Sequence, residues 1–152
     1  MIQRIQSVYL FLAALLPALT FFAPVATLSA DNGQLSISSA YFEAANYPLH
    51  DAILPWGLLI MASILILVNL GNIFCYKNRK KQIRLADCGI AATLLFYAAC
   101  IYHILVHASE TNASVSVSAM FFAPLIGLVF ILLARHAIKS DEALVRAADR
   151  IR

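Results

Sequence analysis

The chain contains four long apolar stretches, and this feature limits its fold more than any other. They cover residues 5–28, 53–76, 88–106 and 115–134, and none contains Asp, Glu, Lys or Arg. A membrane-spanning helix needs about 20 such residues, because each adds about 1.5 Å and the hydrocarbon core is about 30 Å thick. Lipid cannot satisfy backbone hydrogen bonds, so a helix is expected for each stretch. The sequence predicts an all-α membrane protein with four transmembrane helices, a four-helix bundle forming one domain over residues 1–152.

Composition excludes several functions. Only 12% of the 152 residues are charged, against about 25% in soluble domains, which leaves no room for a large catalytic domain outside the membrane. The net charge of +3 is too small to indicate a nucleic-acid partner. Phosphate-binding glycine loops and serine nucleophile motifs are missing from the sequence. We therefore expect no enzymatic activity and no cofactor.

The basic residues predict how the chain is oriented. They occur before the first apolar stretch, between the second and third, and after the fourth. The other two connections contain Asp and Glu but no Lys or Arg. The positive-inside rule therefore predicts that both termini and the loop 77–84 are cytoplasmic. The eleven basic residues are Arg4, Lys77, Arg79, Lys80, Lys81, Arg84, Arg135, Lys139, Arg146, Arg150 and Arg152. We interpret the loop charges as a topology signal, with binding of anionic lipid head groups as the alternative. A cleaved signal peptide at residues 5–28 is disfavoured by the length of the stretch.

Two connections have local structure signals. Asp31-Asn32-Gly33 can close a β-hairpin within residues 29–52, and an irregular polar cap is the alternative. Residues 139–152 predict a short C-terminal amphipathic helix, capped by Ser140 or Asp141. Such a helix can lie on the membrane surface or dock on a protein.

Three histidines form the one candidate metal site. His103 and His107 are four residues apart on the predicted third span, and His50 precedes the second span. With Asp51 and Glu110 they provide ligands that suit zinc or copper. The alternative is hydrogen bonding between neighbouring helices. A metal-binding or redox membrane protein is thus one alternative function.

Asn69 and Asn72 are amides inside the second apolar stretch. They could line a polar path in a small transporter, a further alternative function. Transporters usually show charges inside the membrane or an inverted repeat, and neither is evident in the sequence. We therefore predict that the two amides form a packing seam with interhelical hydrogen bonds.

The two ends of the chain, MIQRIQSVYLFLAA and DEALVRAADRIR, resemble a domain-of-unknown-function family of small bacterial inner-membrane proteins with four predicted spans. The resemblance covers the whole chain. It implies a multi-pass protein of the bacterial cytoplasmic membrane, and it carries no activity or catalytic residue. The matching positions are Gln3, Arg4, Gln6, Leu144, Arg146, Asp149 and Arg150.

Polar groups are sparse in the predicted spans and gather at the predicted cytoplasmic ends. We therefore predict a non-enzymatic accessory or partner-binding subunit. Its expected partners are membrane lipids and a membrane protein or a second copy of the chain, and no nucleic acid. The candidate partner-binding residues are Arg4, Leu144, Arg146, Asp149, Arg150 and Ile151.

Overall fold

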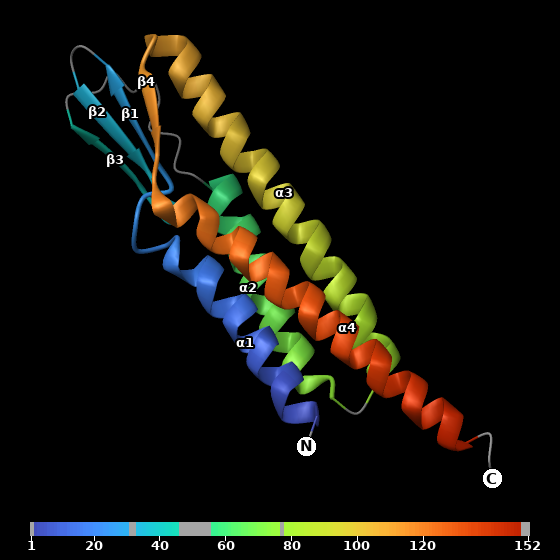
Figure 1. The fold of residues 1–152 in the computed structure, drawn as a ribbon. Helices are drawn as coiled ribbons and strands as arrows, with labels where there is room; N and C mark the ends of the chain where they lie inside the picture. The colour runs from blue at the N-terminus through green and yellow to red at the C-terminus, as the bar shows by residue number, and fades with distance from the viewer. Residues whose placement is uncertain (1, 31–32, 46–55, 77, 150–152) are drawn as a thin grey trace.

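The computed structural model describes residues 2–30, 33–45, 56–76 and 78–149. Within them, four helices pack side by side into what we term the helical body, and a sheet extends from one end of it (Figure 1). The helices are α1 (Ile2–Leu19), α2 (Trp56–Phe74), α3 (Arg79–Thr111) and α4 (Ala123–Asp149). Both α1 and α3 pack against α2 and α4, so the main contacts form a ring. α2 and α3, which follow each other in the chain, are therefore neighbours, and α1 also lies beside α4.

The predicted helical character is confirmed, but the chain is not all-α, because four strands form an antiparallel sheet in the order β3-β2-β1-β4. The expected hairpin is confirmed, because β1 and β2 are antiparallel and Ala30 pairs with Gly33. A two-stranded ribbon alone is marginal in water, and here both outer strands extend it. The strands are β1 (Ala26–Ala30), β2 (Gly33–Ile37), β3 (Phe42–Ala45) and β4 (Ser114–Val117).

Two predicted spans lose residues to this sheet. α1 ends at Leu19, not residue 28, because Pro24 opposes helical backbone before it and the amide of Val25 donates to the carbonyl of Ile37. The start of the span predicted at 115–134 is β4, followed by a 3-10 turn, η1 (Ala119–Phe122). Alternating Ser and Val fit a strand beside β1 better than a helix.

Both boundaries of the third predicted span and the end of the fourth move outward. α3 begins at Arg79 and includes most of the predicted loop 77–84, because the side-chain oxygen of Asn78 accepts from the amide of Lys81 at 3.2 Å and caps the helix. The predicted separate tail helix is also wrong. α4 continues without a break to Asp149, so Ser140 and Asp141 lie inside a helix and do not cap one.

The helices have apolar surfaces that suit lipid. α2, the Arg79–Ser109 part of α3 and residues 119–145 are each long and apolar enough to cross a membrane, while the apolar part of α1 is shorter, Ile5–Leu19. Large apolar side chains cover the outside of the helical body, which would be unfavourable in water. Strongly exposed examples are Phe11, Leu67, Phe74, Leu94, Leu105 and Val129.

The core joins the sheet to the helices. Leu28 and Leu35 from the sheet are fully buried against Leu58 of α2 and Phe96 of α3. The central strands β1 and β2 contain alternating buried and more exposed residues, as expected for a sheet with one face on a core. The sheet is therefore part of the folded unit.

Candidate partner-binding surface at the charged end

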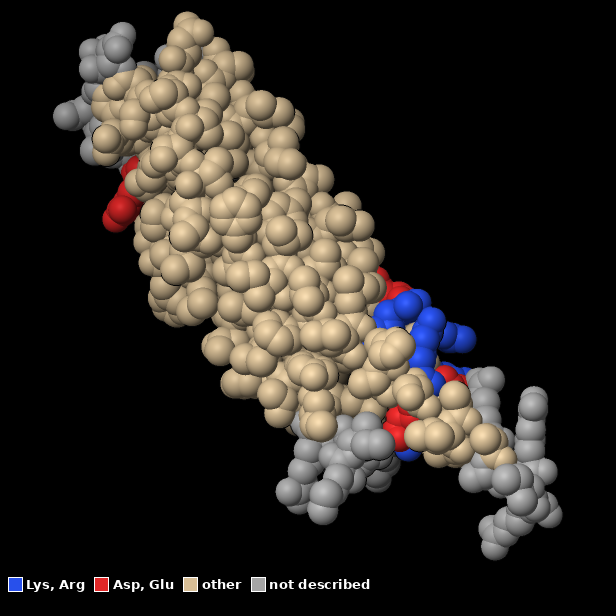
Figure 2. Space-filling view, viewed as in Figure 1, with Lys and Arg blue, Asp and Glu red and all other residues tan. Residues whose placement is uncertain are grey.

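The charged helix side chains that the structure describes gather at the end of the helical body away from the sheet, which we term the charged end. The start of α1 and the end of α4 also lie there (Figure 1). In the space-filling view, Lys and Arg appear at this end, beside Asp and Glu, and a long uncharged surface separates them from the sheet (Figure 2). The described cationic side chains are Arg79, Lys80, Lys81, Arg84, Arg135 and Lys139.

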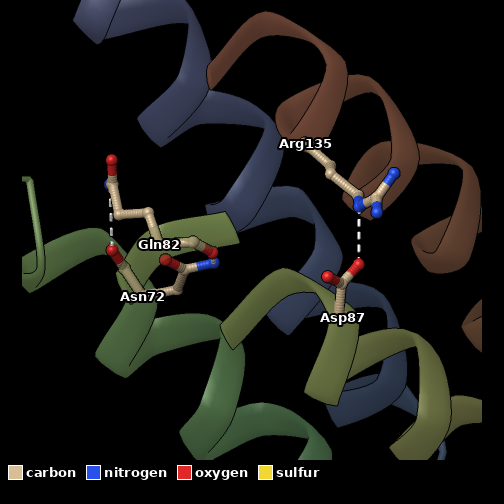
Figure 3. A network of polar contacts seen from close by, with 4 residues as sticks. All are labelled: Asn72, Gln82, Asp87 and Arg135. Atoms are coloured by element: carbon tan, nitrogen blue, oxygen red, sulfur yellow. Dashed lines mark hydrogen bonds and ion pairs between the residues drawn. The ribbon is translucent and has the colours of Figure 1, made fainter. Parts of the chain in front are cut away.

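Two ion pairs hold α3 and α4 together at the charged end. Nε of Arg135 lies 2.5 Å from Oδ1 of Asp87 (Figure 3). Nearer the end, Nη2 of Arg79 lies 3.1 Å from Oδ2 of Asp141, and Nη1 donates to the backbone carbonyl of Asp141 at 2.6 Å. The guanidinium of Arg79 thus binds both the side chain and the backbone of Asp141, which fixes the direction of α4 at this point.

α4 extends beyond this second ion pair. Arg79 is the first residue of α3 and contacts Asp141, so residues 142–149 of the antiparallel α4 pass beyond the start of α3 (Figure 1). We term these residues the overhang. Its Leu144 is 60% exposed and its Val145 is 44% exposed. Two adjacent apolar side chains thus lie on the surface of a segment that extends past the start of α3.

A groove lies between α3 and α4 beside the overhang. Its volume is about 310 Å³, and it is lined by Ile83, Lys139, Glu142 and Ala143. The lining combines one cation, one carboxylate and apolar atoms, so it offers both packing and charged contacts to a peptide.

The structure describes only one of the predicted partner-binding side chains, that of Leu144. Leu144 is exposed on the overhang, as a docking residue must be. Arg4 belongs to α1, and Arg146 and Asp149 belong to α4, but these three side chains lie outside the described ones. Arg150 and Ile151 lie outside the described residues altogether.

Two of the three predicted metal ligands lie together near the sheet. The rings of His103 and His107 stack with centroids 6.3 Å apart and planes 16° from parallel. Phe42 of β3 contacts both rings edge-on, at 5.8 and 5.6 Å. His50 lies outside the described residues, and no group of three possible ligands occurs within them. Aromatic packing thus accounts for the placement of this pair, and the metal site stays a prediction.

The predicted amide seam is confirmed. Nδ2 of Asn69 donates to the carbonyl of Ala13 on α1 at 3.4 Å. Asn72 and Gln82 exchange two bonds of 3.2 Å, each amide nitrogen donating to the other residue's backbone carbonyl (Figure 3). The sequence reasoning missed Gln82 because it assigned that residue to a solvated loop. The signal that could have found it is Asn78, a helix-capping residue four positions earlier.

Comparison with known protein families gave one finding. The family described as "Domain of unknown function (DUF4293)" matches residues 2–151. The chain belongs to this family. A search of curated proteins gave no match. Membership in the DUF4293 family agrees with the resemblance of the two termini, and it assigns no catalytic, metal-binding or partner-binding residue. The function of this DUF4293 chain must therefore be argued from its own geometry.

Proposed function

We propose that the chain is a four-span protein of the bacterial cytoplasmic membrane and a non-enzymatic accessory subunit that docks a membrane-protein partner through the overhang of α4. Both termini and the charged end face the cytoplasm in this proposal. The clustering of described cations at the charged end supports this orientation through the positive-inside rule.

The continuity of α4 is the observation that carries the proposal. Arg135 marks the level at which charges begin on this helix, which is the level of the lipid head groups in the proposed orientation. Leu144 follows nine residues later in the same unbroken helix, about 14 Å further along the axis. A helix that continues along its membrane-crossing direction cannot also lie flat on the surface. Leu144 and Val145 are therefore exposed to water, where a partner protein can cover them.

The overhang has the features of a helical docking segment. Adjacent apolar side chains provide the anchor, and Lys139 and Glu142 in the neighbouring groove provide charged contacts. The ion pair of Arg79 with Asp141 orients the segment before it binds, which lowers the entropic cost of docking.

A photo-crosslinking experiment tests the docking role. A photoreactive residue placed at position 144 of the full-length chain in native membranes should give a crosslink to protein, and one placed at the exposed Leu67 of α2 should crosslink lipid. Replacing Leu144 and Val145 with Ser should then remove the partner from mild-detergent purifications. The matched control replaces Ala147, which is also exposed on α4 but outside the groove lining, with Ser and should retain it.

Two results would refute the docking role. The first is a crosslink from position 144 to lipid alone, which would make the overhang a membrane-surface segment. The second is an unchanged set of co-purified proteins after deletion of residues 143–152, a deletion that keeps the Arg79 and Asp141 pair intact.

A further inference from the structure

α1 is too short to cross a bilayer by itself. Its apolar part, Ile5–Leu19, is about 22 Å long, which is about 8 Å less than the thickness of a hydrocarbon core. Beyond it, the amides of Thr20, Phe21 and Phe22 each donate to the carbonyl three residues before, so the chain continues in tight turns. Phe22 is 80% exposed. Hydrocarbon that surrounds α1 therefore extends past the helix to Phe22.

The helical run that leads into α4 gives a second measure of the same boundary. η1 and α4 follow each other without a break from Ala119, and Arg135 is the first cation along them. The length from Ala119 to Arg135 is about 26 Å, so the hydrocarbon ends just past Ala119. The amide of Ser118 donates to the carbonyl of Val25 at 3.1 Å, which ties this level to the start of β1. Both lengths thus place the boundary where the sheet begins.

Two valines of β4 lie on the face of the sheet that packs on the helices, but they are not covered. Val115 pairs with Leu28 and Val117 pairs with Ala26, and residues directly opposite each other on neighbouring strands point to the same face. Leu28 and Ala26 are fully buried, whereas Val115 is 43% exposed and Val117 is 50% exposed. The apolar face of the sheet therefore continues past the helices that cover it.

We propose that this edge of the sheet rests on lipid, with Phe22, Val115 and Val117 in contact with acyl chains at the hydrocarbon boundary. We term these three residues the apolar rim. β4 leads into the start of α4 (Figure 1), where exposed Phe122 and Val129 continue the apolar surface toward the charged end. The apolar rim is thus continuous with the surface that faces lipid. The inference rests on the membrane-spanning part of the proposed function and is independent of docking through the overhang.

The hydrocarbon boundary is the depth that suits this strand. β4 is an outer strand of the described sheet, and an open strand edge cannot lie inside hydrocarbon, because its backbone groups need hydrogen-bond partners. Head groups and water provide such partners at the boundary. Ser114 and Ser116 alternate with the valines along β4 and are also exposed, so they point to the opposite face. β4 therefore has one face that suits lipid and one that suits water.

Tryptophan quenching by brominated lipid tests the apolar rim. Trp56 is the one tryptophan of the chain, so Trp56→Phe provides a background for Val117→Trp and, as the matched control, Ser116→Trp. Each full-length variant is placed in phosphatidylcholine bilayers with bromine near the head-group end of the acyl chains. We expect quenching at position 117 to be about twofold stronger than at position 116 or more, because the two side chains point to opposite faces of one strand. Equal quenching would overturn the inference.

Two further probes separate the apolar rim from the spanning region. Phe22→Trp is a conservative change and should be quenched as strongly as position 117. Val129→Trp lies on the exposed surface of α4 and should be quenched by lipid brominated deep in the acyl chains. If position 129 were quenched and either rim position were not, a locally thinned bilayer or another protein would account for the rim. That result would overturn the inference and leave the spanning proposal standing. Loss of quenching at all three positions would overturn both, and the crosslink from position 144 tests docking separately.

Discussion

Gly89 and Gly71 lie in contrasting surroundings, one against a neighbouring helix and one in open space. A Cβ at Gly89 would lie 3.2 Å from Oδ1 of Asn69 and 3.5 Å from Cδ1 of Ile131. A Cβ at Gly71 would meet no atom of the described chain within 4 Å. Small residues allow membrane helices to approach closely, and a glycine in open space lacks this function.

The two glycines therefore predict opposite effects of the same substitution. Gly71→Ala should stabilise the protein by about 0.5 to 1 kcal/mol, because alanine favours a helix. Gly89→Ala should destabilise it by about 1 kcal/mol or more, because the buried amide of Asn69 must move. Unfolding in mixed detergent micelles, followed by circular dichroism, measures both. Equal effects of the two substitutions would contradict the close approach at Gly89.

Among the elements, α3 and β4 join the sheet to the helices. α3 has 33 residues and is therefore about 50 Å long, well beyond a hydrocarbon core of about 30 Å. Its last turns lie beside the sheet, and β4 follows directly and pairs with β1. The strands between α1 and α2 and the strand between α3 and α4 thus form one sheet, which lies against the last turns of α3.

A paired substitution tests the burial of this sheet. Leu28 of β1 is fully buried and Val115 of β4, its partner in register, is 43% exposed. Leu28→Ala should cost about 2 to 4 kcal/mol through the cavity it leaves, and should speed amide exchange in β1 and β2. Val115→Ala is the matched control and should have a much smaller effect. Hydrogen exchange with mass spectrometry measures the difference, and similar exchange in both variants would contradict the packing of the sheet against the helices.

The whole molecule is polarised along its length. The described Lys and Arg side chains lie at the charged end, the sheet lies at the other, and the helix surfaces between them are uncharged and apolar (Figures 1 and 2). An apolar belt between two polar ends is the form that a bilayer requires of a spanning protein. The unequal distribution of cations is the basis on which we predict the orientation.

Cysteine labelling tests that orientation. In a variant with the three native cysteines replaced by alanine, Gln34→Cys and Lys80→Cys provide exposed thiols on β2 and at the start of α3. A membrane-impermeant maleimide should label position 34 in spheroplasts, in which the outer face of the cytoplasmic membrane is accessible, and position 80 only after permeabilisation. The cations at the charged end oppose its transfer across the membrane. The reverse pattern would reject the proposed topology.

The sequence by itself determined the features that depend on neighbouring residues. Uncharged apolar runs located the apolar helices, Asp31-Asn32-Gly33 located the hairpin, and Asn69 and Asn72 were identified as an interhelical seam. Each signal lies within a few residues, so hydropathy and turn chemistry can reveal it.

Only the tertiary structure decided the features that join distant segments. β4 is a strand because it pairs with β1, whose Thr27 is 89 residues from Ser116. α4 is held beside α3 by a contact between Arg79 and Asp141, which are 62 residues apart. Considered locally, the residues of β4 fit the start of a membrane span, and Asp141 fits a helix cap. Local propensities differ by only about 1 kcal/mol per residue, so packing and pairing across the chain override them.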